Sequence, residues 1–453
     1  MSVARLVIAG TGSGVGKTTV ATGLMAALRR RGLKVAGFKV GPDFIDPSYH
    51  ALATGRPGRN LDAFLSGPDL IAPLFAHGGH GADVAVIEGV MGLFDGKSGG
   101  GELASTAQVA KLLRAPVVLV VDAAAMARSA AAMVHGFDRF DPELRIAALV
   151  LNRVASDRHE ATLRESLAPL GVPIVGVLRR DDGLASPERH LGLVPVAERR
   201  RLAARTVETL GAAVAAACDL DAVMGLAGGA PALTARAWDP RDAVGRDGPA
   251  EARVAVAGGP AFSFRYKENL ELLAAAGAPP VAFDPLRDPA LPEDAGALYL
   301  GGGFPEEFAP ELSANLPLRA AVAGFVRSRR PVIAECGGLL YLSRELDGLP
   351  MCGAIDAHAR MTDRLTLGYR EAVAAAGSPL CHPGARVRAH EFHYSKIEPE
   401  AGASPAWVLG DRTEGFAAGA IHASYLHTHW AATPTVADRL ARAAAGRPVE
   451  ALA

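Results

Sequence analysis

Residues 10–19 constrain the fold of this chain more than any other feature, because a glycine-rich loop lies there between two different elements. The apolar run at residues 6–9 has the composition of a buried strand. Residues 18–30 repeat apolar side chains every four positions, as an amphipathic helix does. In such a strand–loop–helix unit, the loop amides and the positive end of the helix converge on phosphate oxygens. The stretch therefore predicts a phosphate-binding loop within a parallel α/β domain.

The residues around this loop have separate expected tasks. Lys17 can reach the terminal phosphates of a nucleotide, and Thr18 can coordinate Mg²⁺. Thr11 stands where such loops usually have their first glycine, which lies one residue earlier, at Gly10. Asn152 follows an apolar run and could read the adenine edge, although an ordinary capping role is an equal alternative. The expected nucleotide-binding residues are Gly12, Gly14, Gly16, Lys17, Thr18, Thr19, Lys39 and Asn152.

Acidic side chains gather after two further apolar runs, at the carboxyl ends of strands, where open α/β sheets bind ligands. Carboxylate and hydroxyl oxygens are the ligands that suit Mg²⁺. Any one of the aspartates alone could equally be a turn former beside Gly and Pro. Taken together, they predict a magnesium site formed by Thr18, Asp43, Asp46, Glu88 and Asp95.

Short apolar runs alternate with helical stretches in both halves of the 453-residue chain, a pattern typical of parallel sheets covered by helices. Between the halves, residues 219–250 are rich in Gly, Pro and Ala, which indicates a linker. We expect an α/β protein with two domains, at residues 1–218 and 251–453. The expected strands are 6–9, 35–38, 84–87, 117–121, 146–151 and 174–177 in the first, and 254–257, 281–283, 297–300 and 332–334 in the second.

The second domain carries a candidate nucleophile, Cys336. It follows an apolar strand and precedes two glycines and a helical run, so the sulfur should lie at a helix N-terminus, where the pKa of a thiol falls. The amide of Gly337 and that of Gly303, which ends another strand, could stabilise an oxyanion. The alternative is that Cys336 is a buried structural cysteine, and we assign that role to the other three cysteines.

A histidine-rich run at residues 421–430 offers the base that a thiol nucleophile needs. His427 is the first candidate and His429 the second, since both should lie on the same side of an extended segment. His390 and His393 are further polar candidates, better suited to lining a surface or a substrate cleft.

At these motifs the chain resembles the cobyrinate and hydrogenobyrinate a,c-diamide synthases, glutamine-dependent enzymes that amidate a corrin ring in cobalamin synthesis. The first half is similar to dethiobiotin synthetase, and the second resembles flavodoxin-like class I glutamine amidotransferases. Such glutaminases usually carry a glutamate two residues after the catalytic histidine, where this chain has His429, so a Cys-His pair is an alternative to a triad. The matching segments are 10–19, 39–47, 88–96, 182–190, 334–342, 368–372 and 423–430.

The resemblance implies a mechanism as well as substrates. Cys336 would attack the side-chain amide of glutamine and release ammonia into a sheltered route. ATP and Mg²⁺ would convert an acetate carboxylate of a corrin acid into an acyl phosphate, which ammonia displaces, once at the a and once at the c side chain. Cobyric acid synthase, which amidates other corrin positions, is the nearest rival. Two further rivals are a partition-type regulatory ATPase, whose signature lysine would replace Gly12, and an inactive scaffold that docks partners.

Composition excludes some other classes of function. The formal net charge of −1 gives no electrostatic reason to expect nucleic acid or a membrane surface as partner. Four cysteines without metal-ligand spacing, and an N-terminal apolar run too short for a signal peptide, favour the reduced cytoplasm. The sequence leaves the oligomeric state open, with a homodimer among the options.

Overall fold

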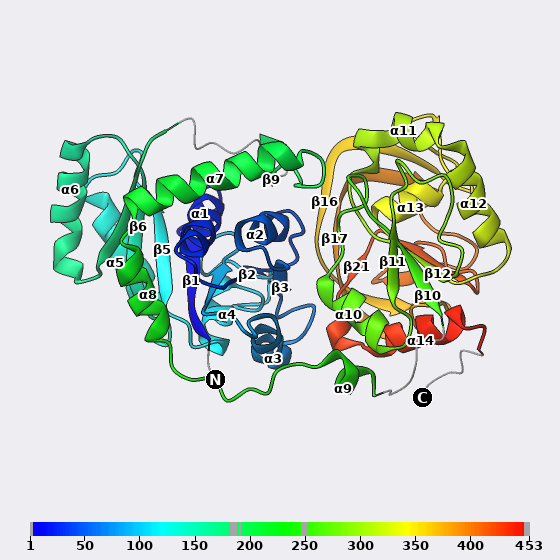
Figure 1. The fold of residues 1–453 in the computed structure, drawn as a ribbon, viewed down its shortest axis with the longest axis horizontal. Coiled ribbons are helices and arrows are strands. Elements are labelled where there is room, and N and C mark those ends of the chain that lie inside the picture. The colour runs from blue at the N-terminus through cyan, green and yellow to red at the C-terminus, as the bar shows by residue number, and fades with distance from the viewer. Residues whose placement is uncertain (1–2, 182–187, 190–191, 246–251, 448–453) are drawn as a thin grey trace. The chain divides into compact units, whose positions relative to one another are not determined.

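The computed structural model describes residues 3–181, 188–189, 192–245 and 252–447. The chain forms two compact units, Met1–Trp238 and Asp239–Ala453, here called unit 1 and unit 2. Both consist of strands covered by helices (Figure 1). Residues 182–187 and His190, which belong to one motif of the resemblance, lie outside the described residues.

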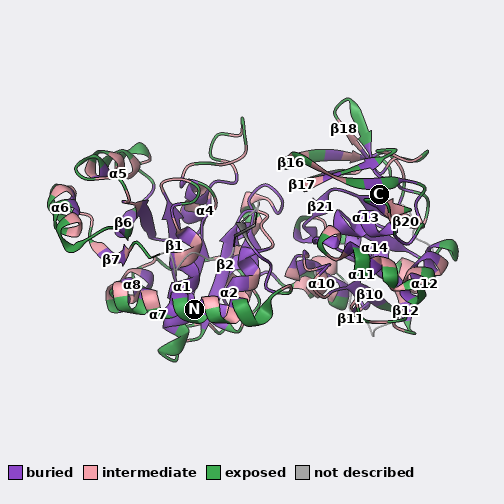
Figure 2. Ribbon diagram, turned by 90° about the horizontal axis from the view of Figure 1, so that it is seen from above, coloured by how far each residue is buried: buried purple, intermediate pink, exposed green. Residues whose placement is uncertain are grey.

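Unit 1 is built on a seven-stranded sheet in the order β3-β2-β4-β1-β5-β6-β7, with every neighbouring pair parallel. Helices lie on both faces of this sheet, which explains why its inner strands read as continuous apolar runs (Figures 1 and 2). All six expected strands are confirmed. The strands are β1 (Ala4–Gly10), β2 (Val35–Val40), β3 (Arg59–Leu61), β4 (Val84–Glu88), β5 (Val117–Asp122), β6 (Ile146–Val154) and β7 (Ile174–Arg179).

The first helix of unit 1 packs closely against the seventh, and glycines make this approach feasible. A Cβ atom on Gly23 would lie 2.5 Å from a methyl carbon of Val214, and one on Gly211 would lie 2.8 Å from the Cβ of Ala26. This packing fixes the helix that follows the phosphate loop. The helices of unit 1 are α1 (Lys17–Arg30), α2 (Asp46–Thr54), α3 (Pro68–Gly78), α4 (Thr106–Leu112), α5 (Ser129–Phe140), α6 (Asp157–Leu167), α7 (Arg200–Ala217) and α8 (Leu220–Gly228).

The segment expected to be a linker, 219–250, contains two helices. The side chain of Asp219 caps α8, and that of Asp239 caps the short helix α9 (Pro240–Val244). The expectation of an irregular linker is wrong at these two helices, because capping aspartates and a few apolar residues suffice to form them in a Gly- and Ala-rich stretch. The boundary between the units falls after Trp238.

Unit 2 contains two sheets rather than one. The first is parallel, in the order β11-β10-β12-β13-β20, and contains all four expected strands. Its strands are β10 (Arg253–Ala257), β11 (Pro280–Phe283), β12 (Ala295–Leu300), β13 (Val332–Glu335) and β20 (Ile421–Ser424).

The second sheet of unit 2 is mainly antiparallel and was not predicted. Its centre is the long pair β16 (His358–Ala374) and β17 (Arg386–Glu398), in which polar and charged residues interrupt the apolar pattern. The chain passes from the first sheet to the second between β20 and β21, and this passage carries the histidine-rich run. The other strands are β14 (Glu345–Leu346), β15 (Leu349–Pro350), β18 (Trp407–Leu409), β19 (Arg412–Glu414) and β21 (His427–Thr428).

The helices of unit 2 bury their apolar sides against the parallel sheet. Tyr341 and Leu339 of α13 belong to the same buried cluster as Phe262 and Leu300. In Figure 2 the central strands are purple, and green lies on the outward sides of the helices. The helices are α10 (Lys267–Ala275), α11 (Ala309–Ala314), α12 (Leu316–Arg327), α13 (Gly337–Leu342) and α14 (Thr435–Ala444).

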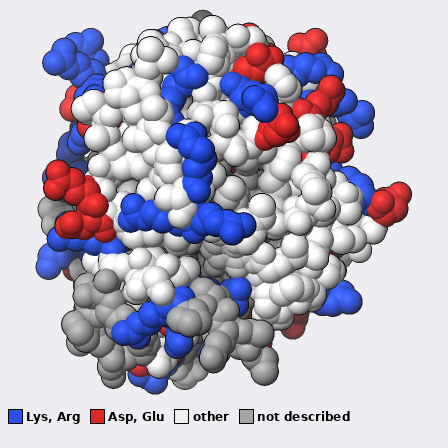
Figure 3. Space-filling model, turned by 90° about the vertical axis from the view of Figure 1, so that its right-hand side faces the viewer, with Lys and Arg blue, Asp and Glu red and all other residues white. Residues whose placement is uncertain are grey.

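The surface carries charges of both signs. On the face shown in Figure 3, basic and acidic side chains are interspersed with uncharged ones. Within the described part of the chain, we find no helix with the length and apolar character needed to cross a membrane.

Gly338 provides a test of how α13 packs on β12. A Cβ atom at this position would lie 2.3 Å from the carbonyl oxygen of Leu300, a backbone atom that no side-chain rotation can move away. We expect Gly338→Ala to lower the free energy of unfolding of unit 2 by about 1–3 kcal/mol. Denaturant titration followed by tryptophan fluorescence measures this change, since Trp407 and Trp430 lie in unit 2.

The matched control is Gly324→Ala on α12, where the nearest atom to an added Cβ is the end of the Arg327 side chain, 3.8 Å away. Alanine there should leave stability unchanged or raise it slightly. Equal effects of the two substitutions would contradict the packing argument.

Candidate functional site

The phosphate loop joins β1 to α1 in a conformation that requires glycine. Gly14 and Gly16 have φ values of 73° and 99°, in the left-handed region. A Cβ atom on Gly16 would lie 2.1 Å from Nδ2 of the Asn152 side chain. This nitrogen donates a 2.9 Å hydrogen bond to the carbonyl oxygen of Val15. Asn152 therefore braces the loop, and its reading of adenine stays a prediction.

Lys17 lies over this loop, where its Nζ donates to the carbonyl oxygen of Gly12 at 2.7 Å. Burial lowers the pKa of Lys17 to about 8, and the nearby charge of Lys39 adds to this effect. A bound anion would favour the charged ammonium, so this position suits a phosphate group.

Three of the five predicted metal ligands lie together beside the loop. The Thr18 hydroxyl donates to Oε1 of Glu88 at 2.6 Å and lies 3.5 Å from Oδ2 of Asp46. The Nζ of Lys39 contacts both carboxylates, at 2.6 Å from Asp46 and 2.8 Å from Glu88. The charge of Lys39 holds the pKa of Glu88 below its usual range although burial alone would raise it, and these carboxylates in turn raise the pKa of Lys39 against the effect of its burial.

These oxygens fit Mg²⁺ only in combination with a nucleotide. Among the residues that the structure describes, no group of three or more His, Cys, Asp or Glu side chains could hold a metal ion. Mg²⁺ commonly uses one or two carboxylates together with phosphate oxygens and water. Thr18, Asp46 and Glu88 match such a partial set of ligands.

The other two predicted ligands shape their own loops. Oδ1 of Asp43 accepts hydrogen bonds from the backbone amides of Ile45 and Asp46, at 2.6 and 3.0 Å, and so shapes the start of α2. Oδ2 of Asp95 accepts one from the amide of Gly92 at 2.8 Å. Their part in metal binding stays a prediction.

His50 is a residue of this site that the sequence analysis did not identify. It is fully buried, and its Nε2 lies 2.6 Å from Oε2 of Glu88. Its place on α2, one turn after Asp46, brings both side chains to the same cluster. Gly37 makes room for it, because a Cβ there would lie 2.9 Å from the Cβ of His50. The four-residue spacing of Asp46 and His50 was the available signal.

Cys336 lies in unit 2 at a sharp turn between β13 and α13. Its φ and ψ are 48° and −102°, an unusual conformation for a residue with a side chain, and its amide donates to the carbonyl oxygen of Ser424 at 2.8 Å. Its Sγ lies 3.6 Å from the carbonyl oxygen of Phe392. A strained strand-to-helix turn of this kind presents a nucleophile at the end of a sheet.

The expected low pKa of this thiol is wrong. Burial raises the pKa of Cys336 above its usual value, and the charge of Glu306 adds to the rise, whereas a hydrogen bond from the Gly337 amide opposes it. The helix that follows has only six residues, so its dipole is small. The group at rest is a thiol, and a base has to remove its proton. Burial also raises the pKa of Cys218, Cys352 and Cys381, in keeping with their expected structural role.

The two glycines expected to form an oxyanion hole lie side by side. A Cβ atom on Gly337 would lie 3.1 Å from the amide nitrogen of Gly303. Gly303 itself has no space for a side chain, because a Cβ would lie 2.1 Å from the carbonyl oxygen of Ala261. The neighbouring Gly302 lies against the first candidate base, His427. A Cβ atom on Gly302 would lie 2.4 Å from Cε1 of this histidine.

The two candidate bases have different surroundings. His427 is in β21 and pairs with His390 across the sheet, and burial lowers its pKa to about 3, so the imidazole is neutral at physiological pH. His429 follows the end of that strand, its ring lies against that of Tyr266 at a tilt of 46°, and it is 3.6 Å from the carboxylate of Glu268. The geometry thus favours His427 as the base near the paired glycines.

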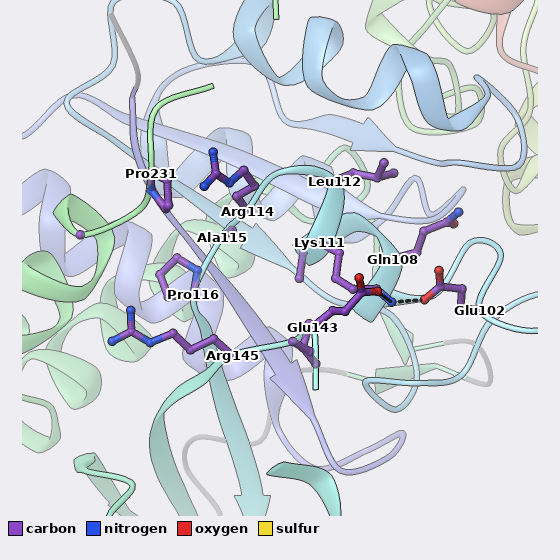
Figure 4. Close-up of a pocket in the computed structure, with 13 residues that line it drawn as sticks. Glu102, Gln108, Lys111, Leu112, Arg114, Ala115, Pro116, Glu143, Arg145 and Pro231 are labelled. Atoms are coloured by element: carbon purple, nitrogen blue, oxygen red, sulfur yellow. Dashed lines mark ion pairs between the residues drawn. The ribbon is translucent and has the colours of Figure 1, made fainter. Parts of the chain in front are cut away.

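The pocket in Figure 4 belongs to a different region of unit 1. Its volume is about 560 Å³, and its lining includes Lys111, Arg114, Pro116 and Arg145, with Lys111 paired to Glu102. Pro116 and Arg145 precede β5 and β6, so the pocket lies at the amino ends of these strands, whereas the phosphate loop follows the carboxyl end of β1. None of the predicted site residues lines it.

Comparisons with known proteins agree with this division of the chain. A family model of the CobQ/CobB/MinD/ParA nucleotide-binding domain matches residues 6–194, and a model of the CobB/CobQ-like glutamine amidotransferase domain matches residues 253–435. A hydrogenobyrinate a,c-diamide synthase of Streptomyces coelicolor is 59% identical, with 97% of each chain covered.

Two further relatives match over similar lengths. The hydrogenobyrinate a,c-diamide synthase of Thermobifida fusca is 54% identical, covering 97% of this chain and 96% of the relative. The cobyrinate a,c-diamide synthase of Syntrophotalea carbinolica is 45% identical, covering 96% and 98% respectively.

Proposed function

Because the chain belongs to the family of hydrogenobyrinate and cobyrinate a,c-diamide synthases, we propose that it amidates the a- and c-acetate carboxylates of a corrin acid, using ATP and glutamine, in cobalamin biosynthesis. The observation that carries the proposal is the presence on one chain of a phosphate loop beside paired carboxylates and a strained cysteine turn beside paired glycines. An amidating ligase needs both an activated carboxylate and a source of ammonia.

The names of the relatives favour a cobalt-free ring as the substrate. Five relatives named hydrogenobyrinate a,c-diamide synthase are 52–59% identical to this chain, and three named cobyrinate a,c-diamide synthase are 44–45% identical. Neither name supports cobyric acid synthase. A regulatory ATPase is disfavoured because it would have no use for the cysteine turn, and Gly12 stands where its signature lysine would be.

Glutamine hydrolysis starts with a proton transfer from the thiol of Cys336 to the neutral imidazole of His427. The sulfur then attacks the amide carbon, and the amides of Gly337 and Gly303 stabilise the oxyanion. The imidazolium returns its proton to the leaving nitrogen, and ammonia departs. Water hydrolyses the thioester to glutamate and restores the thiol.

Amide formation takes place at the phosphate loop. Lys17 and Lys39 neutralise the charge of the phosphoryl group as it moves from ATP to the corrin carboxylate. Mg²⁺, held by Thr18, Asp46 and Glu88, would supply further charge neutralisation at the phosphate oxygens. Ammonia attacks the acyl phosphate, inorganic phosphate leaves, and the amide remains.

Substitutions at Cys336, Lys17 and His427 separate glutamine hydrolysis from amide formation. We expect Cys336→Ala to abolish glutamate release while amidation with free ammonia persists, and Lys17→Ala to abolish amidation with either nitrogen source. His427→Gln should lower glutamate release by about 100-fold or more, because the base is lost. Glutamate release and product mass, after incubation with ATP, Mg²⁺ and hydrogenobyrinic acid, measure both steps.

The control is His429→Gln, which should change glutamate release far less than His427→Gln. The product of the wild-type protein should carry two new amides. A wild-type protein that releases no glutamate and forms no amide with either nitrogen source would refute the proposed function.

His50 should act on nucleotide binding through Glu88. We expect His50→Leu, which removes the hydrogen-bond donor, to weaken Mg²⁺-dependent binding of a non-hydrolysable ATP analogue by about 10-fold or more. His50→Gln retains a donor and should bind within about 3-fold of wild type. Calorimetric titration with Mg²⁺, and again with EDTA, measures the effect.

His135, an exposed histidine on α5, supplies the matched control, and His135→Leu should bind as wild type does. Equal affinity of His50→Leu and wild type in Mg²⁺ would show that Glu88 does not need this contact.

A further inference from the structure

Glu335 joins the segments that carry the nucleophile and the base. It is the last residue of β13 and directly precedes Cys336. Its Oε1 accepts hydrogen bonds from the amide and the hydroxyl of Thr428, at 3.0 and 2.7 Å, and its Oε2 accepts one from the hydroxyl of Tyr299 at 2.9 Å. Thr428 directly follows His427. The neighbours of the two reacting residues are therefore bound to each other.

A second layer of contacts makes this connection rigid. Asn269 donates to the carbonyl oxygen of Thr428 at 2.9 Å and accepts from the amide of Trp430 at 2.9 Å. The indole of Trp430 donates to the Thr428 hydroxyl at 2.9 Å. These residues are all buried, so each polar group depends on a partner within the protein. The side chains of Glu335, Asn269 and Trp430 thus all bind Thr428, the residue directly after His427.

We propose that Glu335 is a positioning residue for glutamine hydrolysis, which sets the approach of His427 to Cys336 by holding Thr428. The proposal rests on the glutaminase function proposed above. In this arrangement the carboxylate fixes the backbone beside the base, whereas the acid of a triad would contact the imidazole itself. His429 occupies the position two residues after the base, where a triad acid is expected, and contacts Glu268 instead.

The protonation state of Glu335 should affect the connection. Burial raises the pKa of Glu335 to about 7, although its hydrogen bonds with Thr428 and Tyr299 oppose the rise. The titratable groups that interact with it are the phenol of Tyr299 on β12 and the thiol of Cys336, and the charge of Arg265 in turn acts on the phenol of Tyr299. All three hydrogen bonds are accepted by the carboxylate. Protonation places a hydrogen on one oxygen, so the connection weakens as the pH falls below about 7.

The test measures kcat and KM for glutamate release as a function of pH, together with thermal unfolding. Wild type should lose kcat as the pH falls through about 7, with little change in the KM for glutamine. Glu335→Gln, whose neutral amide resembles the protonated carboxyl group, should show the lower kcat of acidic wild type at every pH and so lose this pH dependence. Thr428→Val, of almost the same shape, should lower kcat by about 10- to 100-fold with KM nearly unchanged.

Glu414 offers a matched control, since it is another buried glutamate of unit 2 with its pKa raised to about 7 by burial. Glu414→Gln should retain the pH dependence of wild type. The proposal is overturned if the dependence persists in Glu335→Gln, if it disappears in Glu414→Gln, or if folded Thr428→Val keeps full kcat. Wild type that releases no glutamate at all would overturn the glutaminase function and this proposal together, whereas active wild type with unaffected variants would overturn this proposal alone.

Discussion

A buried glutamate at the end of a parallel strand organises the candidate site in each unit. Glu88 ends β4, Glu335 ends β13, and both side chains are almost completely withdrawn from solvent. A carboxylate in such a place is tolerated only when several donors surround it. Each of these two accepts three hydrogen bonds, from residues of at least two other segments. The requirement to satisfy one buried acid therefore brings together segments that lie far apart in the sequence.

The two glutamates differ in the charge of their partners, and this difference sets their chemistry. Glu88 faces the ammonium of Lys39 at 2.8 Å, which holds the pKa of Glu88 low and keeps this carboxylate charged. Glu335 has neutral donors only, so burial dominates and its pKa rises to about 7. A permanently charged acid suits a site that binds a cation with phosphate. An acid that titrates near neutrality can make the geometry of its site depend on pH.

The sequence was sufficient to predict the parts whose local pattern dictates their structure. All ten expected strands and the phosphate loop are present, because apolar runs between glycine-rich turns have few other ways to fold. The antiparallel sheet around β16 and β17 was missed, because many polar and charged residues along these strands obscure the strand pattern. The helices at 220–228 and 240–244 were missed because they are short and lie in a stretch rich in Gly, Pro and Ala, a composition typical of a linker.

Side-chain roles that depend on distant contacts could not be predicted from local sequence. His50 and Glu335 gain their roles from partners 38 and 93 residues away. The pKa of Cys336 was predicted to fall because the helix N-terminus was visible in the sequence, whereas its burial by Phe392 and its neighbours on β17 was not.

The protonation of the cysteine and the histidine has a consequence for the reaction itself. With the thiol pKa raised and the imidazole pKa lowered, both by burial, the resting pair is neutral rather than an ion pair. In the proposed reaction, the proton then has to cross from sulfur to nitrogen before the sulfur attacks glutamine, a step that is very sensitive to distance. A site whose cysteine is not a thiolate at rest depends on accurate placement of the cysteine and the histidine. The dense hydrogen bonding behind Thr428, which contributes no reacting atom, is consistent with that requirement.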